Sequence, residues 1–245
     1  MRHHIRDNPM GVIEFEMGWG DVVNAEAASM VWMRGDLAVE TKQRRGGLLK
    51  SLKSSVLSGE SFFINEYTAN ADGCSLGITG NALGDLASIT VDRQFYVQSG
   101  SYVCSTGDLT LDTQWQGFKR GLFGTNLFTL KTVGEGELFV DCWGALRSHA
   151  LEPGEEMIID NYQIVAFEEM SYDVIKHGNM KTTIFGGDAL VTQFVGPGTV
   201  YYSTKNPMEV ARALAPYMQG RGSKGVGLGM AGMGVGLAGG FLGSR

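Results

Sequence analysis

The chain has 245 residues, which is long for one domain but within the range of single β-sandwiches and β-barrels. It has 36 glycines against 5 prolines and few apolar stretches of helical spacing, which favours short strands joined by tight turns. The formal net charge of −6 excludes a surface that is basic overall, so contact with nucleic acid or anionic lipid would need a local basic patch.

The N-terminal residues and the cysteines indicate the compartment. No apolar segment follows the charged residues 1–7, so the pattern of a secretory signal is not found. The three cysteines, Cys74, Cys104 and Cys142, are widely spaced and odd in number, which fits buried free thiols better than a disulfide framework. We therefore expect a cytoplasmic protein, either free or associated with a membrane surface.

A motif ending in Gly-Asp-Leu recurs along the chain. Residues 29–37, which begin Ser-Met-Val and end Gly-Asp-Leu, match residues 101–109, which begin Ser-Tyr-Val and end with the same three residues. The related sequence Gln-Ile-Val-Ala-Phe follows 62 positions later, at 163–167. This pattern predicts three copies of one structural unit.

A second motif, rich in glycine, supports the same register. Residues 123–136 align without gaps on residues 185–198, again at an offset of 62, and residues 57–63 fit the start of the same frame. The two motifs begin 22 residues apart in copies two and three but 28 residues apart in copy one. Copy one therefore carries an insertion.

The copies predict the fold class. Each has strand-like runs rich in Phe, Val, Leu and Thr, and a unit of about 60 residues is too small to bury both faces alone. We therefore expect an all-β fold, a β-sandwich or double-stranded β-helix-like body with three internal pseudo-repeats, closed around a shared core with pseudo-threefold character, plus a short C-terminal helix. The expected boundaries are one β domain at 1–218, repeats at about 29–100, 101–162 and 163–205, a helix at 207–215 and a glycine-rich tail at 219–245.

The insertion in copy one has the pattern of a short amphipathic helix. In residues 46–56, Leu48, Leu49, Leu52 and Val56 share one helical face, and the lysines lie towards the other. Such a helix could lie on a membrane or a partner. Packing against its own domain is the simpler interpretation.

Basic side chains gather after the Gly-Asp-Leu motif in each copy. If the copies are equivalent, these loops lie at one end of the molecule and form a patch that could bind the phosphate groups of lipid or nucleic acid. Solvated loop lysines without a ligand are the equally weighted alternative. The candidate residues for binding an anion or partner are Lys42, Arg44, Arg45, Lys50, Lys53, Lys119, Arg120, Lys176 and Lys181.

A helix is predicted near the C-terminus. Asn206 suits the N-cap, Pro207 the first helical position and Glu209 the first turn, and the helix is expected to end before Pro216. The tail that follows has glycines at small-xxx-small spacing, but its apolar content is too thin for a transmembrane span. We expect a flexible tail or a contact within an oligomer.

Three short motifs of the chain together resemble the altered-inheritance-of-mitochondria family. They are Ser-Gly-Glu-Ser-Phe-Phe at 58–63, Phe-Gly-Gly-Asp-Ala-Leu at 185–190 and Tyr-Ser-Thr-Lys-Asn at 202–206, and the resemblance covers roughly 29–218. Prokaryotic members form a domain of unknown function. The resemblance implies a fold like that of the tryptophan RNA-binding attenuation protein, three internal repeats and a homo-trimer, with no enzymatic activity. This sequence departs from the family pattern at Thr125-Asn126, where Gly-Glu is usual.

No catalytic, metal or cofactor site is predicted. The four histidines lack the paired spacing of a metal site, and no Gly-x-Ser-x-Gly elbow occurs. Glu60 and Asp188 share one repeat position, but Asn126 occupies it in copy two. All three residue types accept hydrogen bonds in turns, so a structural cap is favoured over acid–base chemistry.

These patterns together predict a non-catalytic homo-oligomeric scaffold or binding protein. A trimer is the expected assembly, and an anionic membrane surface or a protein is the expected partner. An RNA-binding regulator is the alternative, and it rests on fold analogy alone.

Overall fold

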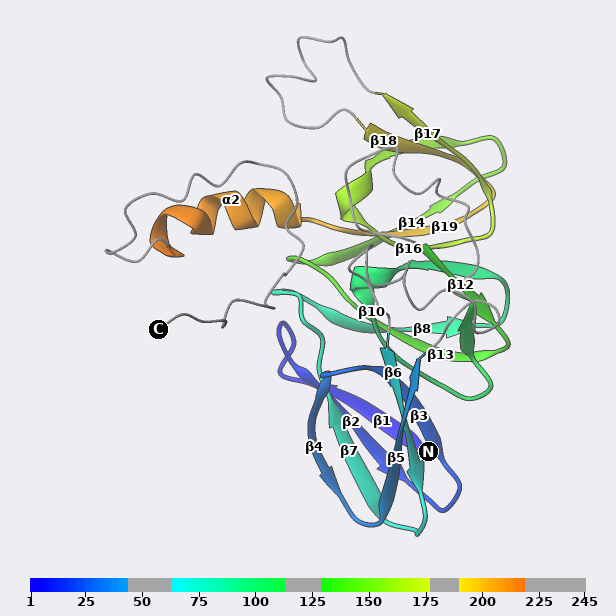
Figure 1. Cartoon of the computed structure of the whole chain (residues 1–245). Helices are drawn as coiled ribbons and strands as arrows, with labels where there is room; N and C mark the ends of the chain where they lie inside the picture. The colour runs from blue at the N-terminus through cyan, green and yellow to red at the C-terminus, as the bar shows by residue number, and fades with distance from the viewer. Residues whose placement is uncertain (44–62, 113–128, 177–189, 219–245) are drawn as a thin grey trace, which may run out of the picture.

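The structure is a computed structural model that describes residues 1–43, 63–112, 129–176 and 190–218 (Figure 1). These residues form antiparallel β-sheets and one C-terminal α-helix, which confirms the predicted fold class. The predicted insertion helix, the turn residues Glu60, Asn126 and Asp188, and the glycine-rich tail lie outside the described residues.

The strands form four sheets within the described residues. In spatial order, the first contains β1 (Arg2–Arg6), β2 (Val12–Met17), β7 (Cys74–Ile78) and β4 (Met30–Arg34). The second contains β5 (Leu37–Gln43), β6 (Phe63–Ala69), β3 (Val22–Glu26), β10 (Tyr102–Thr106), β13 (Gly136–Asp141) and β8 (Leu86–Val91). The third contains β11 (Thr110–Asp112), β12 (Thr129–Val133), β9 (Phe95–Gln98), β16 (Ile164–Glu168), β19 (Gly198–Ser203) and β14 (Leu146–Leu151). The fourth contains β15 (Glu156–Asp160), β18 (Leu190–Val195) and β17 (Ser171–Lys176).

The strand order repeats along the chain. Adding six to each strand number of the second sheet, β5-β6-β3-β10-β13-β8, gives the third sheet, β11-β12-β9-β16-β19-β14. Adding six again to the first half of the third sheet, β11-β12-β9, gives the whole fourth sheet, β17-β18-β15. Subtracting six from the second half of the second sheet, β10-β13-β8, gives β4-β7-β2, which are three of the four strands of the first sheet. The equivalent strands β4, β10 and β16 begin at Met30, Tyr102 and Ile164, next to the expected repeat starts.

The structural repeats comprise β2–β7, β8–β13 and β14–β19, so each begins two strands before β4, β10 or β16. They stack in a row, with the first sheet at the bottom of Figure 1 and the fourth at the top. Strand β3 pairs with β10 and joins the first repeat to the second, and β9 pairs with β16 and joins the second to the third. Among the described residues, no strand pairing joins the third repeat back to the first. Among the described residues, each repeat pairs only with its sequence neighbour, so they show a row of repeats and not the expected closure around one shared core.

The core consists of three hydrophobic clusters that follow one another along the stack. Alternation along β2 buries Ile13, Phe15 and Met17 on one face, and the Phe15 ring packs edge-on against Phe139 of the second sheet at a centroid distance of 5.2 Å. The burial of apolar faces between successive sheets holds the repeats together.

The three cysteines are free and buried, as the sequence predicts. Burial raises the pKa of Cys142 to about 11 and that of Cys104 well above its ordinary value. Both therefore stay protonated near neutral pH. The Cys74 thiol lies 3.3 Å from the carbonyl oxygen of Asp36, to which it donates.

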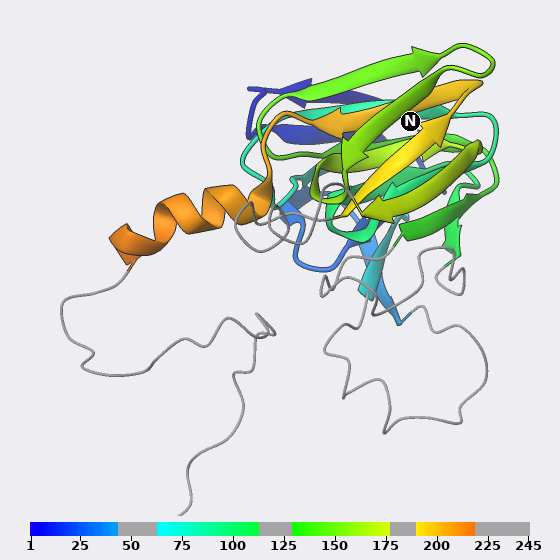
Figure 2. The same ribbon diagram turned by 90° about the horizontal axis from the view of Figure 1, so that it is seen from above.

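Helix α2 (Pro207–Met218) begins where the sequence predicts, and Asn206 Oδ1 accepts the Met208 N–H at 2.9 Å as an N-cap. The helix continues past Pro216, contrary to the predicted end at 215. Proline removes one backbone donor, and only two residues follow it, so the last turn accommodates it. No residue of α2 is buried, and the helix projects away from the sheets (Figure 2). Across the described ranges, every helix falls short of the length and apolarity that a membrane-spanning helix requires.

Candidate functional site

The three basic segments of the sequence connect equivalent strands. Residues 44–62 lie between β5 and β6, residues 113–128 between β11 and β12, and residues 177–189 between β17 and β18, which are the corresponding edge hairpins of successive sheets. Lys42 lies in β5, and Lys176 ends β17. The remaining candidates lie outside the described residues: Arg44, Arg45, Lys50, Lys53, Lys119, Arg120 and Lys181.

Strand β4 is an exposed apolar edge. All five of its residues are exposed, including Met30, Val31, Trp32 and Met33, whereas all five residues of the equivalent β10 are buried. Each of β4, β10 and β16 carries a register irregularity after its first residue, which supports their equivalence. Strand β10 has β3 as its second neighbour, but within the described residues β4 pairs only with β7.

The outer face of the first sheet is shaped by Trp32. Its indole lies over Gly77 of β7, where an added Cβ would come within 2.4 Å of the indole nitrogen. At the equivalent pair of the second repeat the large side chain is on the other strand, because the small Cys104 of β10 lies opposite the large Phe139 of β13. The face of β10 and β13 that carries this pair is covered by the first repeat, whereas within the described residues no other repeat covers the face that carries Trp32.

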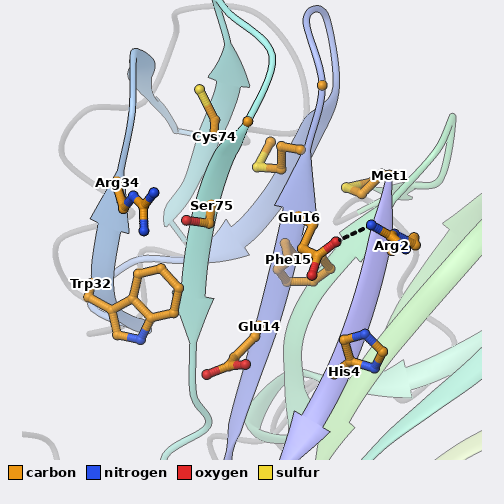
Figure 3. A pocket seen from close by; sticks show the side chains of 13 residues that line it. Met1, Arg2, His4, Glu14, Phe15, Glu16, Trp32, Arg34, Cys74 and Ser75 are labelled. Atoms are coloured by element: carbon orange, nitrogen blue, oxygen red, sulfur yellow. Dashed lines mark ion pairs between the residues drawn. The ribbon is translucent and has the colours of Figure 1, made fainter.

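A cavity of about 570 Å³ lies on this face beside β4 (Figure 3). The register aligns residues of its lining in two rows across the sheet, Arg2, Glu16, Ser75 and Arg34 in one, and His4, Glu14 and Trp32 in the other, where Gly77 separates Glu14 from Trp32. Arg2 forms an ion pair with Glu16 at 2.7 Å. The cavity therefore brings guanidinium, carboxylate and indole groups together on one face of the sheet.

Two carboxyl groups, the half-buried Glu26 and the buried Asp141, lie where the first and second repeats meet, at the ends of β3 and β13. The Asn81 side chain donates to Glu26 Oε2 at 3.3 Å, and the Ala82 N–H donates to Asp141 Oδ2 at 2.7 Å. Burial raises the pKa of Asp141 from 3.8 to about 6. Burial, followed by the charge of Asp141, raises the pKa of Glu26 from 4.5 to about 7. Neither residue lines the cavity beside β4.

This pair makes stability depend on pH. Because both pKa values are raised in the folded state, the folded chain binds more protons than the unfolded chain between about pH 4 and pH 7. The free energy of unfolding therefore falls as pH rises through this window. We expect Asp141→Asn to raise it by on the order of 2 kcal/mol at pH 8 and by about half as much at pH 5. Urea unfolding at both pH values measures this, and an equal change at both would contradict it.

Sequence reasoning missed both the exposed edge of β4 and the pair of carboxyl groups, Glu26 and Asp141. The motif at 29–37 resembles its copies, so the exposure of β4 is not visible in its composition. The available signal was that residues 1–28 contain no further copy of this motif. Glu26 and Asp141 lie far apart in the sequence and have no pattern in common. No group of three or more His, Cys, Asp or Glu residues suited to a metal ion occurs in the part of the chain that the structure describes.

Comparison with known proteins identifies the family. The family model described as mitochondrial biogenesis AIM24 matches residues 3–205. The chain belongs to the AIM24 family. This confirms the resemblance read from the motifs. The AIM24 chain is 26% identical over 216 residues to an uncharacterized protein of Streptococcus pyogenes serotype M6, covering 84% of this chain and 86% of that one. An X-ray crystal structure of a Streptococcus pyogenes protein superposes with a TM-score of 0.71 at 25% identity, covering 89% of this chain and 99% of that one.

Proposed function

We propose that this AIM24 family member is a non-catalytic, homo-oligomeric scaffold that assembles through the free edge of β4. The observation that carries the proposal is the exposure of all five residues of β4, a strand whose equivalents are central in their sheets. An edge strand of consecutive apolar residues is a template for pairing with another chain. A closed trimer is the proposed assembly.

The basic segments are proposed to contact an anionic membrane surface. They are inserted at the same place in successive sheets, so assembly would bring several sets of them together. Each Lys or Arg near an anionic leaflet contributes about 1 kcal/mol, and the contribution falls with salt. A cytoplasmic protein would meet such a leaflet at the inner face of the membrane.

Neutralising one basic segment tests the membrane contact. We expect Arg44→Gln with Arg45→Gln to weaken co-sedimentation with anionic vesicles by roughly 30-fold at low salt, because about 1 kcal/mol is lost per charge. The matched control is Arg93→Gln with Arg212→Gln, which removes the same charge from exposed side chains elsewhere. Equal weakening by both variants, or salt-sensitive binding to single-stranded RNA but not to vesicles, would contradict the membrane contact.

A further inference from the structure

We infer that β4 of one copy pairs antiparallel with β15 of the next copy, so that the copies join head to tail. The inference rests on the proposed self-assembly and names the partner surface. It follows from the order of the strands, from their register and from the exposure of the residues that would meet.

Two half-sheets end the stack. In the second sheet the half β5-β6-β3 continues through β10 into the next repeat, and in the third sheet β11-β12-β9 continues through β16. Among the described residues, no half-sheet of a further repeat pairs with β15 of the equivalent half β17-β18-β15 or with β4 of the half β4-β7-β2. Within the described residues, β15 pairs only with β18 and β4 only with β7. The halves β17-β18-β15 and β4-β7-β2 therefore correspond to the two halves of a complete sheet such as the second.

The two joints inside the chain give the register between copies. Ala25 lies opposite Cys104 at the first joint, and Val97 lies opposite Ala166 at the second. Val97 of β9 pairs with Leu130 of β12. In the next repeat, Ile159 of β15 pairs in the same way with Thr192 of β18, so Ile159 corresponds to Val97. Trp32 and Cys104 are each the first paired residue after the register irregularity in β4 and in β10, so Trp32 corresponds to Cys104.

The register then places three residue pairs opposite one another across the contact. Trp32 of one copy meets Ile159 of the next, and in the same way Met33 meets Ile158 and Arg34 meets Met157. Met33 and Ile158 are each 49% exposed in the single chain. Their counterparts at the second joint, Phe167 and Tyr96, are directly paired and buried, with their rings stacked at 5.1 Å. Pairing would bury Met33 and Ile158 in the same way.

This contact uses different surfaces on the two copies. Contacts of this kind produce a ring when the rotation closes and an open chain when it does not. In a ring of three copies, every β4 and every β15 edge would be paired. A twofold contact of β4 with β4 would instead leave β15 free, so the two arrangements differ in which residues become neighbours.

Cross-linking of the full chain tests the pairing. In Met33→Cys/Ile158→Cys, a short thiol-specific cross-linker should join most chains into covalent multimers, because opposed Cβ atoms lie about 5 Å apart. The two positions lie in strands at opposite ends of the stack, so the cross-link forms between chains (Figure 1). Each single variant and the exposed control Leu83→Cys should remain monomeric on a denaturing gel. The three native thiols are buried and should not react.

The outcomes separate the pairing from the proposed function. Multimers in the double variant alone support the pairing. Multimers from Met33→Cys alone indicate a contact of β4 with β4 and overturn it. Absence of cross-links in a protein whose native mass is a multiple of 26.4 kDa also overturns it and leaves the scaffold standing. A monomeric native mass overturns the scaffold itself.

Discussion

Met33→Lys is expected to dissolve the assembly into monomers of 26.4 kDa while the chain stays folded. The side chain is 49% exposed on a free edge, so lysine is tolerated in the single chain. Across the proposed contact, the lysine ammonium group would lie opposite Ile158 and lose its hydrating water. This loss costs free energy, and lysines on edge strands block strand pairing for this reason. Sedimentation velocity at micromolar concentration measures the effect.

Leu83→Lys is the matched control for this experiment. Leu83 is also an exposed apolar residue, at 54%, but it lies outside every strand. The control should assemble like the unmodified chain, and both variants should unfold at similar urea concentrations. Unchanged assembly of Met33→Lys would show that β4 is not the contact.

Phe167→Ala is expected to lower the free energy of unfolding by about 3–5 kcal/mol. The ring is buried in the third hydrophobic cluster and contacts three other rings, with centroid distances of 5.1 Å to Tyr96, 5.4 Å to Tyr172 and 5.0 Å to Phe194. Truncation leaves a cavity between the third and fourth sheets, because three aromatic neighbours cannot all move into it. Urea unfolding followed by fluorescence measures the change.

Tyr217→Ala is the control for the core substitution. Tyr217 is 86% exposed near the end of α2, and its truncation should change the free energy of unfolding by less than about 0.5 kcal/mol. A loss below about 1 kcal/mol for Phe167→Ala would contradict the tight packing between these sheets.

Local signals in the sequence located much of the fold. The recurring Gly-Asp-Leu motif places Gly35 and Gly107 in turns with φ of 95° and 72°, where glycine avoids the strain of a side chain. The Asn-Pro pair at 206–207 fixed the start of α2 because capping depends on neighbouring residues alone. Burial of the cysteines followed from the apolar runs around them.

Features that depend on distant residues were not predictable. Closure of the repeats was expected because small units must bury their faces, but stacking in a row buries them equally well, and sequence periodicity does not distinguish the two. Trp32 is exposed because β7 is the only strand that pairs with β4 among the described residues, and the pKa of Glu26 is raised by burial and then by the charge of Asp141, which comes from another repeat. The proposed contact therefore became visible only from the strand order.

The measurement that tests the account most directly is the native mass of the unmodified chain by light scattering, at several micromolar concentrations. Assembly into a closed trimer predicts about 79 kDa, three times the chain mass of 26.4 kDa, at every concentration well above the dissociation constant. A larger multiple would replace the closed trimer by a longer head-to-tail assembly. A constant mass of 26.4 kDa would show that the β4 edge stays unpaired and would contradict the proposed scaffold.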